Sequence, residues 1–274
     1  MAENEAPQQA PKPDPAFDPR IPPKVQPNAN SQIKRVIAVI SGKGGVGKST
    51  VTGLLASAVA RTGASVGIMD SDITGPSMPK AFGITERLGT DGQAMIPAET
   101  AQGIKMVSTN LILERDDMPV VWRGPILSNV VRQFFGEANW GTLDYLFVDM
   151  PPGTSDVTLT AFQALPIDGV VVVTSPQDLV EMIVDKAVNM AREMNVPIIG
   201  IVENMAAFTC PDCGTTHYLF GKPKGLELAH KRGIPSYAML PIDPHVAELE
   251  DAGRIYEANQ DEALKDVLDF VMER

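Results

Sequence analysis

The stretch that decides the fold is Ser41-Gly42-Lys43-Gly44-Gly45-Val46-Gly47-Lys48-Ser49-Thr50. It follows an apolar, β-branched run over 36–40 and leads into a segment of helical composition over 51–61. A G-x-x-x-x-G-K-[ST] pattern between a strand and a helix is typical of a phosphate-binding loop, because glycines let backbone N–H groups close around phosphate oxygens. A glycine-rich turn without a ligand is the alternative, but the full pattern rarely arises in this context by accident. We expect a nucleotide to bind at Gly42, Gly44, Gly45, Val46, Gly47, Lys48, Ser49 and Thr50.

We expect different roles for the charged and hydroxyl side chains of this loop. Lys48 is placed to reach the β- and γ-phosphates of the nucleotide, and the hydroxyl of Ser49 is placed to bind Mg²⁺. Lys43 is unusual, because a second lysine after the first glycine is not needed to bind the phosphates of its own site. The simplest interpretation of Lys43 alone is a solvated surface lysine.

Composition limits the classes of function open to the chain. Its 274 residues suffice for one large α/β domain. A net charge of −11 and an isoelectric point near 4.8 argue against nucleic acid as a main partner. No apolar stretch reaches about 18 residues, so we expect no association with a membrane by a spanning helix. The acidic N-terminus differs from a secretory signal and only two cysteines occur, so we expect a cytoplasmic protein without disulfides.

Residues 1–31 are expected to form a proline-rich tail. Eight of the 23 prolines fall there, and the segment has no helical or strand periodicity. Such a segment cannot bury enough apolar surface to fold alone, so it either lies extended against the core or hangs free. We expect residues 32–274 to form the phosphate-binding domain, with a cysteine-containing loop at 210–213.

Beyond the tail, short apolar runs alternate with longer amphipathic segments. The runs predict strands at 36–40, 65–70, 104–108, 145–149, 170–174, 198–203 and 236–240. The amphipathic segments predict helices near 48–61, 125–136, 154–165, 179–194, 222–232, 243–252 and 260–273. This order predicts an α/β fold with a doubly wound, mostly parallel sheet and helices on both faces. A small hairpin is expected over 89–100, around Asp91-Gly92.

Carboxylates follow two of the predicted strands, at the sheet edge where ligands gather in such folds. Asp149 ends the apolar run 145–148 and is expected to hold Mg²⁺ directly or through water. Asp72 follows the second strand. If the bound nucleotide is hydrolysed, Asp72 is the candidate that orients and polarises the water molecule that attacks it. Asp70 lies beside it and is able to share or take that role. The alternative for each aspartate is a helix cap or an Asx turn.

Several segments resemble one class of ATPase. K-G-G-V-G-K-S-T at 43–50 resembles the deviant Walker A loop of the MinD/Mrp class of P-loop ATPases. The resemblance implies a homodimer in which Lys43 reaches the partner's nucleotide, in the manner of an arginine finger. It also implies that Asn204 recognises adenine, the alternative being a turn-capping side chain. Segments similar to motifs of the Mrp-type members lie at 70–77, 121–125, 149–156, 175–178 and 203–205.

Cys210 and Cys213 are the two cysteines of the chain, in the sequence C-P-D-C-G. A C-P-x-C-G turn is expected to expose both sulfurs on one side of a tight loop, which suits soft-metal binding by zinc or an iron–sulfur cluster. Nothing else completes a four-ligand site by spacing; His217 is close, but a lone loop histidine is more often a surface residue. Two thiolates are half of what either metal site requires, and a two-fold dimer supplies the other half. A redox dithiol is disfavoured, because no thioredoxin-like setting surrounds the pair.

With these cysteines, the chain resembles the Mrp/ApbC-type iron–sulfur cluster carrier ATPases. The resemblance implies slow hydrolysis of ATP with Mg²⁺, a [4Fe–4S] cluster bridging two subunits through Cys210 and Cys213, and transfer of that cluster to apoproteins. One alternative is an ATPase of the MinD/ParA kind that organises positions in the cell, although the acidic C-terminal helix disfavours an anionic membrane. The other alternative is a dimeric ATPase in which zinc, rather than an iron–sulfur cluster, links the two subunits.

Overall fold

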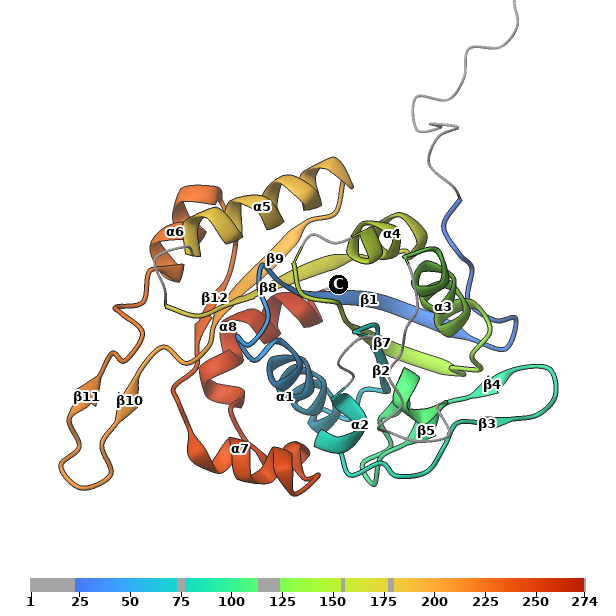
Figure 1. Cartoon of the computed structure of the whole chain (residues 1–274), viewed down its shortest axis with the longest axis horizontal. Coiled ribbons are helices and arrows are strands. Elements are labelled where there is room, and N and C mark those ends of the chain that lie inside the picture. Colours follow the sequence, from blue (N-terminus) through green and yellow to red (C-terminus); the bar gives the residue numbers. More distant parts are fainter. Residues whose placement is uncertain (1–22, 73–76, 113–123, 154–155, 177–179, 274) are drawn as a thin grey trace, which may run out of the picture.

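The computed structural model of the chain describes residues 23–72, 77–112, 124–153, 156–176 and 180–273. The strands of its main sheet are β1 (Gln32–Ser41), β2 (Val66–Asp70), β5 (Ala98–Glu99), β6 (Lys105–Val107), β7 (Thr142–Asp149), β8 (Gly169–Thr174), β9 (Ile198–Glu203) and β12 (Tyr237–Met239). Within the described residues, these eight strands pair in the order β12-β9-β8-β1-β7-β2-β6-β5 (Figure 1). Every pairing is parallel except that of β5 with β6. The predicted doubly wound, mostly parallel α/β fold is therefore confirmed.

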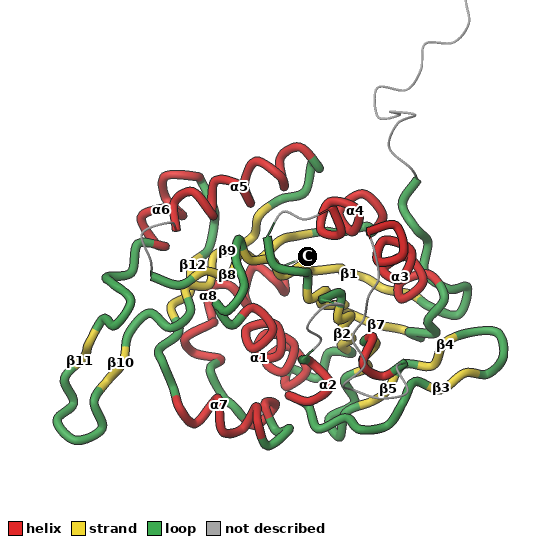
Figure 2. Tube along the Cα trace, in the orientation of Figure 1, coloured by secondary structure: helices red, strands yellow, loops and turns green. Residues whose placement is uncertain are grey.

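Helices cover both faces of this sheet (Figure 2). They are α1 (Lys48–Arg61), α2 (Met78–Ala81), α3 (Gly124–Gly136), α4 (Asp156–Ala164), α5 (Val180–Glu193), α6 (Gly225–Arg232), α7 (Pro244–Asp251) and α8 (Asp261–Met272). Helices α3 to α6 lie on one face, and α1, α2, α7 and α8 lie on the other (Figure 1). The described residues also contain two short 3₁₀ turns, η1 (Thr109–Leu111) and η2 (Ile255–Glu257).

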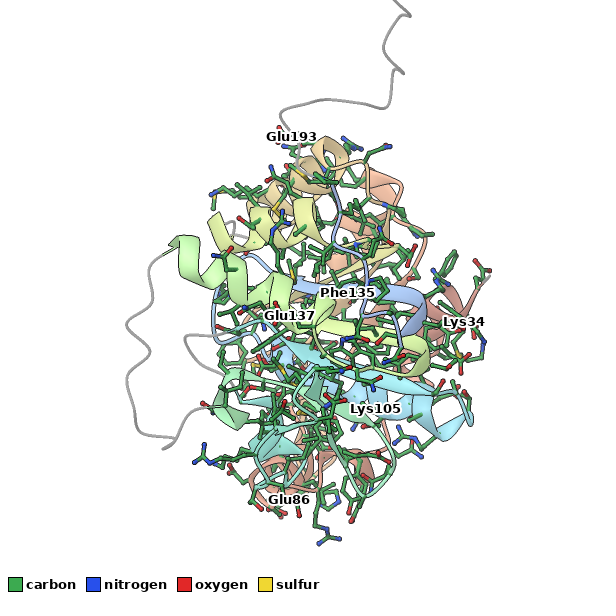
Figure 3. All side chains as sticks on the ribbon, turned by 90° about the vertical axis from the view of Figure 1, so that its right-hand side faces the viewer. Lys34, Glu86, Lys105, Phe135, Glu137 and Glu193 are labelled. Carbon is green, nitrogen blue, oxygen red and sulfur yellow. The ribbon has the colours of Figure 1, made fainter. Side chains whose placement is uncertain are left out.

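Two hydrophobic clusters hold the three layers together. Phe134 and Phe162 belong to the cluster between the sheet and α3–α6, whereas Leu55 and Val267 belong to the cluster on the opposite face. Strands β2 and β8 are buried along their whole length, and β1 and β7 are buried in their C-terminal halves, because both faces of the sheet are covered there. Figure 3 shows this layering from the side, with Phe135 inside and charged residues such as Glu86 and Glu193 at the periphery.

The predicted hairpin is present in a shorter form. Strands β3 (Gly89–Thr90) and β4 (Met95–Ile96) pair antiparallel, and Asp91 accepts hydrogen bonds from the backbone N–H groups of Gln93 and Ala94. The chain then leaves the hairpin, and β5 joins the main sheet beside β6. Strand β5 and helix α2 are elements that the periodicity of the sequence does not predict, since two to four residues carry too little of a pattern.

The described end of the expected tail lies against the core. The N–H of Val25 donates to the carbonyl of Ala164 over 2.7 Å, and the hydroxyl of buried Ser31 donates to the carbonyl of Ala138. Residues 1–22 lie outside the described residues. Among the residues that are described, no helix has the length and apolar character needed to cross a membrane.

The topology brings the chemically interesting residues to one edge of the sheet. Asp70 lies opposite Asp149 in the pairing of β2 with β7, and Thr174 lies opposite Glu203 in the pairing of β8 with β9. Strand β1 runs between these two pairs of strands and ends at Ser41, where the glycine-rich loop begins. The loops that follow β1, β2, β7, β8 and β9 therefore meet at the carboxyl edge.

Candidate functional site

The glycine-rich loop has the backbone geometry of a phosphate-binding loop. Gly45 and Gly47 have φ angles of 77° and 79°, in the left-handed region that favours glycine. Helix α1 begins at Lys48, directly after Gly47. A Cβ atom on Gly47 would lie 2.2 Å from Nδ2 of Asn204, so a side chain at this position would displace the asparagine. A glycine-rich loop of this geometry, directly before a helix N-terminus, suits an anion.

Lys48, Ser49 and Asp149 converge at the start of α1. Nζ of Lys48 lies 2.7 Å from Oδ2 of the buried Asp149 carboxylate, and the hydroxyl of Ser49 donates to the same oxygen over 2.6 Å. The hydroxyl of Thr52 donates to the other oxygen, Oδ1, over 2.8 Å. Sequence reasoning missed Thr52, although it lies on the same face of α1 as Ser49 at a spacing of three residues. The Asp149 carboxylate therefore faces one cation and two hydroxyl groups.

Asp70 and Asp72 occupy different environments beside this group. Asp70 is fully buried and accepts hydrogen bonds from the hydroxyl of Ser108 (3.0 Å) and the N–H of Asp72 (3.1 Å), so it forms an Asx turn. Asp72 reaches the edge of the site, with 15% of its side chain exposed and Oδ2 3.9 Å from Nζ of Lys48. Of the two carboxylates, Asp72 is the one that solvent reaches.

The proton affinity of Asp70 follows from its surroundings. Burial, and then the neighbouring charge of Asp149, raise the pKa of Asp70 to about 7, against a partial offset from Lys48 and Ser108. Desolvation and a like charge both disfavour the ionised carboxylate. Asp70 thus keeps its proton at a pH where an exposed aspartate is ionised.

Lys43 lies half-buried in the loop, and its carbonyl accepts a hydrogen bond from the hydroxyl of Ser41 over 3.0 Å. Gly44 and Gly45, which follow it, are exposed. Parts of the motifs quoted from the sequence lie outside the described residues, namely 73–76, 121–123, 154–155 and 177–178. The geometry of the site therefore rests on the loop 41–50 and on the described ends of the strands.

Asn204 links strand β9 to the phosphate-binding loop. Its backbone N–H donates to the carbonyl of Thr174 on β8, and Nδ2 of its side chain donates to the carbonyl of Val46 over 3.0 Å. Asn204 also lines a cavity of about 240 Å³ beside α1. The expected base-reading residue therefore lies at a cavity next to the loop and also supports the loop itself.

This cavity contains polar residues that sequence reasoning did not select. Glu250 of α7 accepts a hydrogen bond from the hydroxyl of Thr50 over 2.9 Å, and burial raises the pKa of Glu250. Nε2 of Gln260 donates to Asp243, the N-terminal cap of α7, over 3.1 Å. The role of Asp243 as a helix cap could have been predicted from the sequence, since this aspartate follows the last predicted strand. The apolar part of the wall comprises Leu54, Met205, Leu240, Pro241, Ile242, Pro244, Val246 and Ala247.

The two cysteines lie in a hairpin that projects from the carboxyl edge (Figure 1). Strands β10 (Phe208–Thr209) and β11 (Thr216–His217) pair antiparallel and hold the turn that contains Cys210 and Cys213. The N–H of Cys210 donates to the carbonyl of Thr215, and the N–H of Gly214 donates to the carbonyl of Cys210, both over 2.9 Å. Cys213 is exposed and Cys210 is half-buried. The two cysteines therefore differ in exposure, whereas the sequence predicted that both sulfurs are exposed.

The hairpin favours the thiolate form of one cysteine. Hydrogen bonds from the side chain and backbone of Thr215, and then from the thiol of Cys210, lower the pKa of Cys213. Metal ions bind the thiolate rather than the thiol, so this shift favours a metal ligand. Across the described part of the chain, no group of three or more histidine, cysteine or acidic side chains is arranged to hold a metal ion. One described chain therefore offers a soft metal two thiolates.

A family model describes this combination of fold and site. The model of the ParA group described as NUBPL iron-transfer P-loop NTPase matches residues 32–274. The chain belongs to this family. Membership in the iron-transfer P-loop NTPases confirms the kind of relative that the loop and the C-x-x-C motif predicted.

Individual relatives agree with the family. An iron-sulfur cluster carrier protein of Clostridium perfringens is 49% identical over 233 residues, which cover 82% of each chain. The solved structure of a nucleotide-binding protein from Archaeoglobus fulgidus, in complex with ADP, is 41% identical with a TM-score of 0.78, and the match covers 88% of this chain and 93% of that one. The septum site-determining protein MinD of Pyrococcus horikoshii, solved with Mg-ADP, shares the fold at 19% identity and a TM-score of 0.63, over 88% and 97% of the two chains.

The proton on Asp70 leads to a pH-dependent stability of the metal-free chain. The folded state holds this proton above pH 4, where the unfolded state has released it, so the contribution of Asp70 to stability falls as the pH rises from about 4 to about 7. Asp70→Asn removes the titration. Between about pH 5 and pH 7 the wild type should lose about 2 kcal/mol relative to Asp70→Asn, at up to about 1.4 kcal/mol per pH unit.

Urea unfolding of both proteins at the two pH values, in EDTA and without nucleotide, measures this difference. Asp144→Asn is the control, because hydrogen bonds from Lys34 and Ser65 hold the pKa of Asp144 below its usual range and keep it ionised at both pH values. Equal pH dependence in the wild type and in Asp70→Asn would show that Asp70 is ionised throughout.

Proposed function

We propose that this chain is an ATP-binding and ATP-hydrolysing iron–sulfur cluster carrier. As a homodimer it binds a bridging [4Fe–4S] cluster and transfers the cluster to apoproteins. The observation that carries the proposal is that strand β9 leads from the nucleotide cavity, at Asn204, directly into the hairpin of Cys210 and Cys213. An organiser ATPase of the MinD kind has no use for two thiols beside its nucleotide site, so this pairing favours the carrier.

The first part of the proposal is the binding of ATP with Mg²⁺. Gly42, Gly44, Gly45, Val46, Gly47 and Thr50 form the loop and first turn around the phosphates. Asp149 and Ser49 supply hard oxygen ligands of the kind that Mg²⁺ takes together with phosphate oxygens and water. A cation already suits this position, since the ammonium of Lys48 lies between Asp149 and Asp72. Mg²⁺ held by Asp149 and Ser49 would neutralise negative charge on the phosphates of the nucleotide.

The second part is hydrolysis. Water attacks the γ-phosphorus, the bond from that phosphorus to the β–γ bridging oxygen breaks, and ADP and inorganic phosphate leave. Lys48 would stabilise charge on the β- and γ-phosphates, and Asp72 at the solvent-accessible edge would orient the attacking water. Lys43 would supply a second positive charge to the site of the partner subunit. We expect the reaction to be slow.

The third part is the dimer. Two thiolates per chain are half of the ligands of a [4Fe–4S] cluster, and a two-fold axis between two hairpins supplies the rest. The segment after β11 supports this arrangement, because three consecutive large apolar residues are exposed there: Tyr218 by 48%, Leu219 by 61% and Phe220 by 44%. Exposed large apolar residues that are adjacent to one another are typical of contact surfaces. Contact with a second copy at the hairpins would cover them.

The cysteines and the charge of the chain also favour a compartment and a class of partner. Thiolate ligands persist in a reducing compartment, so we place the protein in the cytoplasm. Its partners are apoproteins that receive clusters. The acidity of the chain disfavours nucleic acid and anionic membranes as partners. Zinc is the second candidate for the hairpin, because a site of four thiolates from two chains also suits zinc.

Substitution of either cysteine tests the metal site. Cys210→Ala and Cys213→Ala should abolish cluster loading, because each removes a thiolate from both halves of the site, and should leave ATP binding intact. Anaerobic reconstitution with iron and sulfide, followed by iron analysis and visible absorption, measures loading. His217→Ala is the matched control, since His217 is exposed on the same hairpin and is expected to be no ligand.

Wild-type iron content in either cysteine variant would contradict the proposed cluster site. Wild-type protein that carries zinc and gains no visible absorption on reconstitution would support the zinc-stapled dimer instead. Both outcomes are read from the metal and do not require an assay of cluster transfer.

Substitutions in the loop separate nucleotide binding from hydrolysis. Lys48→Ala should weaken ATP binding by about 10- to 100-fold, the equivalent of lost charge-assisted hydrogen bonds. Lys43→Ala should keep ATP binding and slow hydrolysis by up to about 10³-fold, if it acts as arginine fingers do. Equilibrium binding and phosphate release measure the two effects.

Mixed dimers test whether Lys43 acts across the interface. A Lys43→Ala subunit keeps Asp72 and would receive Lys43 from an Asp72→Ala partner, so mixing two inactive proteins should restore hydrolysis. Mixing Lys43→Ala with the double variant Lys43→Ala/Asp72→Ala is the control and should restore none. Failure of the first mixture to recover at any ratio would count against both the dimer and the role of Lys43.

A further inference from the structure

Glu203 is a buried carboxylate that neither the nucleotide site nor the cysteines use. Oε1 accepts a hydrogen bond from the N–H of Lys224 over 3.1 Å, and Oε2 accepts one from the N–H of Gly225 over 2.8 Å. The hydroxyl of Tyr237 donates to Oε2 over 2.7 Å. Burial, and then the adjacent Glu203, raise the pKa of Tyr237, so the phenol keeps the proton that it donates. Three donors thus satisfy a carboxylate that is inaccessible to solvent.

These contacts join the two ends of the cysteine-bearing segment. Glu203 is the last residue of β9, and the segment 204–223 then runs out through the hairpin and returns. Lys224 and Gly225 are the cap and first residue of α6, and no side chain of the cap itself forms a hydrogen bond there. The carboxylate of Glu203 therefore replaces the missing cap and closes the base of the hairpin segment.

The packing around this carboxylate leaves no room for a side chain at position 225. A Cβ atom on Gly225 would lie 2.7 Å from Oε2 of Glu203 and 2.5 Å from Cε2 of Tyr237. Only glycine allows the backbone of α6 to approach the carboxylate this closely. The contact between the end of β9 and the start of α6 is therefore tightly packed.

The same strand end also contacts the nucleotide site. Asn204, the next residue, donates through Nδ2 to the carbonyl of Val46 in the phosphate-binding loop. The carbonyl of Glu203 accepts the N–H of Leu240, a residue of the cavity wall. Three neighbouring contacts thus connect the loop and the cavity with both ends of the hairpin segment.

We propose that Glu203 is a positioning residue that transmits the state of the phosphate-binding loop to the cysteine hairpin. The inference rests on the proposed function in taking the loop for the nucleotide site and the hairpin for the metal site. When a nucleotide shifts the loop, Asn204 moves with the carbonyl of Val46, and the rigid carboxylate carries this movement to α6 and to the base of the hairpin. A purely structural Glu203 would hold the hairpin equally in all nucleotide states.

Hydrogen exchange of the full chain, free of metal, tests the proposal with and without Mg-ADP. The readout is the exchange of amides in 205–225, including the hydrogen-bonded N–H groups of Cys210 and Gly214. In the wild type, ADP should change these rates by about fivefold or more, the lower end of ordinary coupling between sites. In Glu203→Gln, ADP should still bind, while the response of the hairpin should fall below about twofold, because the amide offers one acceptor oxygen where two were used.

Asp144→Asn is the matched control. Asp144 also accepts a backbone N–H, that of Ser65, but near the start of β7 and far from the carboxyl edge. This variant should keep the full response to ADP. If Glu203→Gln fails to fold, Tyr237→Phe removes one of the three donors without changing the carboxylate, and should reduce the response partly.

Two results would overturn the proposal: a hairpin in Glu203→Gln that responds to ADP as in the wild type, or a wild-type hairpin that does not respond. Neither depends on iron, so failure here differs from failure of the proposed function. If the proposed cluster site were wrong, the cysteine variants would keep the iron content of the wild type. The exchange response of the hairpin to ADP would then be unaffected.

Discussion

The site depends on one constraint, that the central strands of the sheet run parallel. Their carboxyl ends lie at the same edge of the sheet, so loops that are distant in the sequence meet there. Asp70 and Asp149 become neighbours by strand register, and β8 aligns Thr174 with Glu203. The phosphate-binding loop emerges from the strand between these pairs. The hairpin of Cys210 and Cys213 continues from the same edge, so the proposed metal site and the proposed nucleotide site are built on the same sheet edge.

Charge organises the interior of this edge. Lys48 is buried beside Asp149 and close to Asp72, and its ammonium compensates carboxylates that would otherwise repel one another. In the proposed function Lys48 would contact the phosphates, and Asp149 would help to hold Mg²⁺. Asp70 lies deeper and compensates for its neighbours by holding a proton. The arrangement suits a site that alternates between nucleotide states.

Sequence predicted the fold class, the loop and the strand-end aspartates, because each depends on local pattern: apolar runs, glycine spacing and a carboxylate after a strand. It missed residues whose importance arises from tertiary contact. Glu250 reaches Thr50 from a helix 200 residues away, and Glu203 caps a helix that begins 22 residues later. Strands β10 and β11 contain two residues each, too few for a periodic signal, so the cysteines were placed on a turn but not on a hairpin.

The central claim is that nucleotide and cluster are bound by one coupled unit. The most direct test is the affinity for ADP and for a non-hydrolysable ATP analogue, measured anaerobically by calorimetry on metal-free and cluster-loaded protein. We expect the cluster to change at least one of these affinities by about 5- to 150-fold, and that nucleotide to change the affinity for the cluster by the same factor. Identical nucleotide affinities in both forms would contradict the account.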